Sequence, residues 1–73
     1  MQTHEIRHDI HKIRAAFGGC VTSSYKQRGL RRLREAQDML GKNNDHAESM
    51  LREARYELQY AAELTEIREL RSA

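Results

Sequence analysis

The chain of 73 residues contains no proline, the residue that most strongly breaks a helix when it lies in the interior. Ala, Leu, Arg, Glu and Gln dominate the sequence, and these residues are strong helix formers. Glycine and capping residues cluster in two short stretches, 18–23 and 41–44. The sequence therefore predicts an all-α fold with three helices.

We expect these helices over about residues 3–17, 25–40 and 45–71, with the third helix the longest. The connections between them are short, so consecutive helices should be antiparallel neighbours in one domain, residues 1–73. The predicted fold is a small antiparallel three-helix bundle. A long hairpin of the last two helices, with the N-terminal helix as a mobile addition, is the alternative.

The expected helix ends rest on local signals. Gly18-Gly19 should stop the first helix, because a residue there can adopt the left-handed conformation that closes a last turn. Ser24 with Gln27, and Asp45 with Glu48, have the spacing of capping boxes and are predicted to open the second and third helices.

Apolar residues recur at alternating spacings of four and three, which is the pattern of a helix face directed at a core. Gly29 lies on this face of the second helix, where it would let another backbone approach closely. The predicted core residues are Ile6, Ile10, Ile13 and Phe17, then Leu30, Leu33, Ala36 and Leu40, then Ala47, Leu51, Ala54, Leu58 and Ala61.

The third helix carries a second apolar stripe on its other side. We call this set the outer stripe: Tyr56, Tyr60, Leu64, Ile67 and Leu70. An exposed apolar stripe is typical of an interaction surface, and tyrosine is favoured at interfaces. Two interpretations remain: the first helix folds across this stripe and buries it, or another chain, identical or different, packs there.

Small size makes a second chain or a metal ion a reasonable source of stability, because a core of this size contributes only a few kcal/mol. The single cysteine excludes an internal disulfide and suits a reducing compartment, which we expect to be the cytoplasm. Neither a signal peptide nor a membrane-spanning run is evident.

Three polar features are candidate sites. His4, His8 and His11 share one face of the first helix and are a weak candidate for zinc binding, although this face should point to solvent. Cys20 would need a positioned base to act as a nucleophile, and is better interpreted as a half-buried loop residue. The basic cluster of the second helix could follow a phosphate backbone; it consists of Lys26, Arg28, Arg31, Arg32 and Arg34.

The sequence favours a non-enzymatic helical adaptor or regulator that packs against another protein or its own copy as a homo-oligomer. A nucleic-acid-binding regulator that uses the basic cluster is the alternative. No cofactor, small-molecule substrate or membrane partner is expected.

Overall fold

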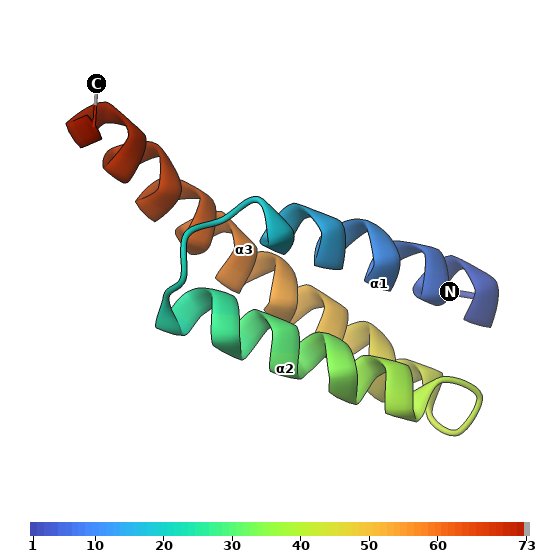
Figure 1. Cartoon of the computed structure of the whole chain (residues 1–73). Helices are drawn as coiled ribbons and strands as arrows, with labels where there is room; N and C mark the ends of the chain where they lie inside the picture. Colours follow the sequence, from blue (N-terminus) through green and yellow to red (C-terminus); the bar gives the residue numbers. More distant parts are fainter. Residues whose placement is uncertain (73) are drawn as a thin grey trace.

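The computed structural model describes residues 1–72 and contains three helices: α1 (Thr3–Gly18), α2 (Ser24–Met39) and α3 (Asn44–Ser72). Consecutive helices run in opposite directions, and α1 and α2 both pack along α3 (Figure 1). The predicted three-helix bundle is thus confirmed, and α3 is the longest helix. Each helix end lies within one residue of its predicted position.

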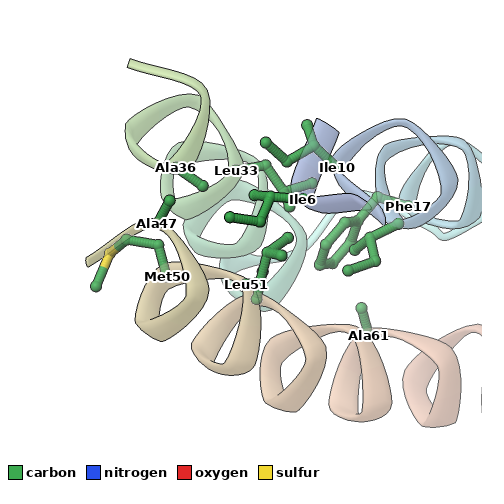
Figure 2. Close-up of a cluster of buried hydrophobic side chains, with 11 residues drawn as sticks. Ile6, Ile10, Phe17, Leu33, Ala36, Ala47, Met50, Leu51 and Ala61 are labelled. Atoms are coloured by element: carbon green, nitrogen blue, oxygen red, sulfur yellow. The ribbon is translucent and has the colours of Figure 1, made fainter. Parts of the chain in front are cut away.

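The core forms where the three helices face one another (Figure 2). All four predicted residues of α1 are buried, so the N-terminal helix is an integral part of the bundle and the hairpin alternative is wrong. In α2 and α3 the predicted face is also correct, although Leu30, Leu40 and Leu58 are only partly buried at its edge. Met50 is a core residue that the predicted spacing missed.

Both predicted capping boxes are wrong by one or two residues. Ser23, not Ser24, caps α2, since its hydroxyl accepts a hydrogen bond of 3.1 Å from the backbone N–H of Lys26. At the start of α3 the side-chain oxygen of Asn43 accepts from the N–H of His46 at 3.1 Å. These side chains satisfy N–H groups that the first helical turn leaves unpaired.

Glu48 has a different partner from the one predicted for it. Its carboxylate forms an ion pair of 2.9 Å with the amine of Met1. This hydrogen bond to Glu48 is the main cause that raises the pKa of the amine. The contact fastens the start of α1 to the first turns of α3.

Gly19 and Gly29 differ from the sequence-based expectation in their backbone conformation and close neighbour, respectively. Gly19 follows α1 with a φ of −86°, so no left-handed residue closes that helix; Gly41, after α2, has a φ of +78°. Gly29 is buried as predicted, but its close neighbour is the ring of Phe17 rather than a backbone. An added Cβ at this position would lie 2.1 Å from the Phe17 Cζ atom.

The last turns of α3 project past the rest of the bundle (Figure 1). The loop between α1 and α2 meets α3 at Thr65, whose hydroxyl accepts a 3.0 Å hydrogen bond from the N–H of Val21 and donates one to the carbonyl of Ala61. Residues 66–72, which we call the overhang, are all exposed. Thr65 therefore marks the end of the packed part of α3.

Candidate functional site

The outer stripe is exposed along its whole length. The exposed fractions are 62% for Tyr56, 49% for Tyr60, 38% for Leu64, 46% for Ile67 and 77% for Leu70. Among residues 1–72, Met1 is the one other large apolar residue in this exposed class. The interpretation in which α1 covers the stripe is wrong.

The position of α1 explains this exposure. α1 packs along a different flank of α3, where Arg55 forms an ion pair of 2.9 Å with Asp9. Glu48, seven residues or two helical turns earlier, holds Met1 on the same flank. The opposite flank of α3 is occupied by α2, so the side between these flanks and away from the core has no helix over it.

Aromatic packing extends the outer stripe onto α2. The ring of Tyr60 stacks on that of Tyr25, with 5.3 Å between centroids and 28° between planes. The guanidinium of Arg28 lies 5.2 Å from the centroid of the Tyr25 ring. Sequence reasoning missed Tyr25, although the antiparallel hairpin of α2 and α3 places it level with Tyr60.

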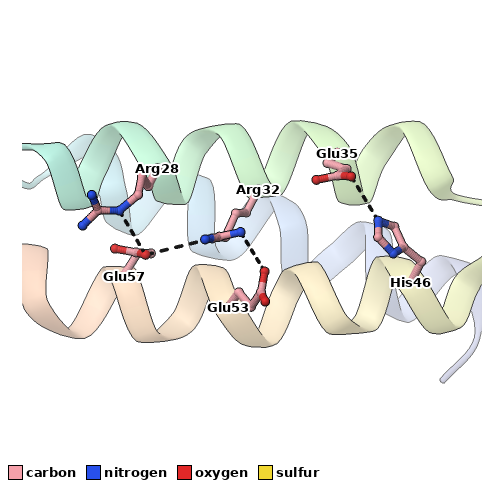
Figure 3. A network of polar contacts seen from close by, with 6 residues as sticks. All are labelled: Arg28, Arg32, Glu35, His46, Glu53 and Glu57. Atoms are coloured by element: carbon pink, nitrogen blue, oxygen red, sulfur yellow. Dashed lines mark hydrogen bonds and ion pairs between the residues drawn. The ribbon is translucent and has the colours of Figure 1, made fainter.

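A row of ion pairs closes the α2–α3 edge beside the outer stripe (Figure 3). Glu57 lies 3.3 Å from Arg28 and 4.0 Å from Arg32, and Arg32 forms a second pair of 2.8 Å with Glu53. Towards the turn between these helices, His46 contacts Glu35 at 3.1 Å. Part of the predicted basic cluster thus binds carboxylates of α3.

The remaining members of the basic cluster are divided between two places. The ammonium of Lys26 donates to the carbonyl of Cys20 at 2.9 Å. Arg31 and Arg34 are exposed on the outer side of α2, beside a shallow hollow of about 240 Å³. The structure therefore does not bring the five cations together on one face, and the positive charge available to a polyanion is smaller than the sequence suggests.

A notch of about 460 Å³ lies at the base of the overhang, open to solvent. Cys20 is on its edge and half-buried, with its thiol donating to the carbonyl of Ala16 at 3.5 Å. No histidine contributes to the lining, and no hydrogen bond joins the Cys20 thiol to a titratable side chain within residues 1–72. The lining residues are Gly19, Cys20, Val21, Thr65, Arg68, Glu69 and Ser72.

The histidine face of α1 is exposed, as expected for His4, His8 and His11. Within residues 1–72, no group of three or more His, Cys, Asp or Glu side chains is arranged to hold a metal ion.

Comparisons with protein-family models, with curated proteins and with solved structures found no significant match to this chain. In the described part of the chain, no helix has the length and apolar character needed to cross a membrane. The outer stripe is consequently the feature on which a functional argument must rest.

Proposed function

We propose that the protein is a small, non-enzymatic helical adaptor or regulator that docks a helix of a protein partner on the outer stripe. The partner is its own copy or another chain. The observation that carries this proposal is the exposure of five large apolar side chains on one side of α3, while the core is closed without them.

The energetics support docking by a partner that contributes apolar area of its own. Full burial of a large apolar side chain is worth about 1.5–3 kcal/mol, and the stripe residues are roughly half exposed, so covering all five yields on the order of 5 kcal/mol. Association costs at least about 4 kcal/mol in lost freedom of motion. The stripe alone is therefore barely sufficient, and a matching apolar face on the partner supplies the remainder.

The shape of the site also suits a helix. The stripe runs along one side of a continuous helix that extends from Asn44 to Ser72. A partner helix laid along it would meet anchors at successive turns, which is the usual geometry of helix recognition. The single free thiol agrees with a reducing compartment, and we propose the cytoplasm.

The experiment is affinity capture with two matched double variants. Tyr60→Ala with Ile67→Asp removes the centre of the outer stripe, whereas His8→Ala with His11→Asp makes similar changes on the solvent face of α1. Far-UV circular dichroism checks that both variants stay helical, because Tyr60→Ala also removes the stack with Tyr25.

A partner captured by the wild type should be lost with the stripe variant and retained with the α1 variant. Self-association, followed by analytical ultracentrifugation, should respond in the same way. Binding that survives the stripe variant, or a chain that binds neither itself nor any other protein, would refute the proposal.

A further inference from the structure

We infer that the occupant of the outer stripe is the outer stripe of a second copy, packed antiparallel; this inference rests on the proposed function. The first indication is spacing. Four residues of the outer stripe and Glu63, which precedes the fifth stripe residue Leu64, form a line with spacings of four, three, four and three residues. This repeat keeps one line of side chains against a partner helix. The line consists of Tyr56, Tyr60, Glu63, Ile67 and Leu70.

Glu63 is the residue that decides the orientation. It is exposed, and no ion pair within residues 1–72 involves it. In a parallel pair the two copies of Glu63 would face each other in the same layer, and two carboxylates in contact repel. A parallel pair is therefore disfavoured at Glu63, the centre of this line of residues.

Antiparallel pairing gives the Glu63 carboxylate a hydrogen-bond donor. The layers of such a pair place Tyr60 opposite Glu63 of the second copy, and Tyr56 opposite Ile67. The phenol of Tyr60 can then donate to the carboxylate of Glu63, and symmetry forms this contact twice. The central polar residue is satisfied by the chain's own tyrosine.

Charges at the ends of the stripe agree with the same register. With Tyr60 opposite Glu63, the same antiparallel register places Leu70 and Arg71 of one copy level with Glu53 of the other. The Glu53 side chain is 48% exposed and pairs with Arg32 on one side only, so its carboxylate can accept a second cation. Arg71 is exposed at the far end of α3 and supplies that cation.

The register also accounts for the overhang. Residues 66–72 of one copy lie opposite residues 51–57 of the other, the stretch of α3 that α2 flanks through the Arg28 and Arg32 ion pairs. Each overhang would thus rest beside two packed helices. In a parallel pair the overhangs would contact only each other and keep their remaining sides in solvent.

The test uses single cysteines in a Cys20→Ser background, in which serine retains a donor for the Ala16 carbonyl. One protein carries Glu53→Cys and the other Leu70→Cys. Mild oxidation of the mixture should give a cross-linked dimer with one chain of each kind. Leu70→Cys alone should not cross-link, since antiparallel pairing separates the two copies of residue 70 by roughly 25 Å at 1.5 Å per residue.

Tyr60→Phe provides a second, independent measurement. It keeps the ring stack with Tyr25 but removes the hydroxyl that would bind Glu63. We expect sedimentation to show a dimer Kd weakened by roughly a hundredfold or more, because two hydrogen bonds to a charged group are lost per dimer. Thermal unfolding of the Glu53→Cys, Leu70→Cys and Tyr60→Phe proteins confirms that each is folded.

Two results would overturn the inference. One is cross-linking of Leu70→Cys with itself, which would establish parallel pairing and leave the proposed function intact. The other is a monomer at every concentration. In that case, stripe-dependent capture of a different protein would still support the proposed function, and its absence would remove both.

Discussion

Gly29→Ala tests how closely α1 and α2 pack. A methyl group at this position would lie 2.1 Å from Cζ of Phe17 and 2.7 Å from each of its Cε atoms. Phe17 is fully buried, so its ring has little free volume into which it can turn. Either the ring leaves its position or α1 moves away from α2.

Two opposing effects set the change in the free energy of unfolding. Replacing an interior helical glycine by alanine stabilises a helix by about 1 kcal/mol, whereas overpacking a core typically costs about 1–3 kcal/mol. A contact of 2.1 Å lies far inside the van der Waals distance, which favours the upper part of that range. We therefore expect a net loss of about 1–2 kcal/mol, and Tm should fall by roughly 4–8 °C for each kcal/mol.

Thermal unfolding followed by circular dichroism measures this loss. Gly18→Ala is the matched control, because an added Cβ there has no neighbouring atom within 4 Å and Tm should not fall. Combining Gly29→Ala with Phe17→Leu should destabilise less than the sum of the single changes, since the methyl group enters space that the smaller side chain vacates. If Gly29→Ala lowers Tm no more than the control does, or if the effects of the two changes simply add, the close contact between Phe17 and Gly29 is refuted.

Three further outcomes follow from contacts in the bundle. Thr65→Val leaves the N–H of Val21 without its acceptor and should lower the free energy of unfolding by about 1–2 kcal/mol. Amide hydrogen exchange at residue 21 should become faster, and an unchanged exchange rate would contradict the contact. Glu57→Gln removes the carboxylate between Arg28 and Arg32 and should cost about 0.5–1 kcal/mol at low salt, a loss that must shrink in concentrated salt. A metal chelator should leave Tm unchanged, because the core is apolar and no metal-holding group forms within residues 1–72; a lower Tm would contradict this.

The helices and the core face could be predicted because they depend on periodicity. The four apolar residues of α1 follow spacings that only one side of a helix can satisfy, and all four are buried. Short connections then left few ways to arrange three such helices. Gly29 was correctly placed in the core for the same reason, but periodicity carries no information about which atom faces it.

The capping residues could not be predicted because neighbouring positions offered equivalent chemistry. Ser23 and Ser24 both have a hydroxyl that can cap a helix, and Asn43 is followed by Asn44 and Asp45. Which of these residues caps the helix depends on which one has the extended backbone that precedes the first helical turn. At Ser23 the backbone has φ −160° and ψ 167°, which is the non-helical conformation that a cap requires.

One regularity in the sequence would have revealed more of the candidate site. In a hairpin that turns at residues 41–44, positions whose numbers sum to about 85 lie level on the two helices. Tyr25 with Tyr60, Arg28 with Glu57, and Arg32 with Glu53 all obey this sum and all are in contact. The same sum would have predicted that the basic cluster is partly neutralised by α3.

The distribution of apolar side chains around α3 supports the proposed docking of a partner on its outer side. Towards the core this helix presents three fully buried alanines, Ala47, Ala54 and Ala61, beside the larger Met50 and Leu51. The large apolar side chains of the outer stripe lie on the other side of α3, where the stack of Tyr60 on Tyr25 is their one aromatic contact with α2 within residues 1–72. Isolated exposed apolar residues are ordinary, but a continuous stripe of five on one helix is not. Covering these side chains with an apolar helix would remove their exposed area from water, which is the source of stabilisation that the proposed docking would use.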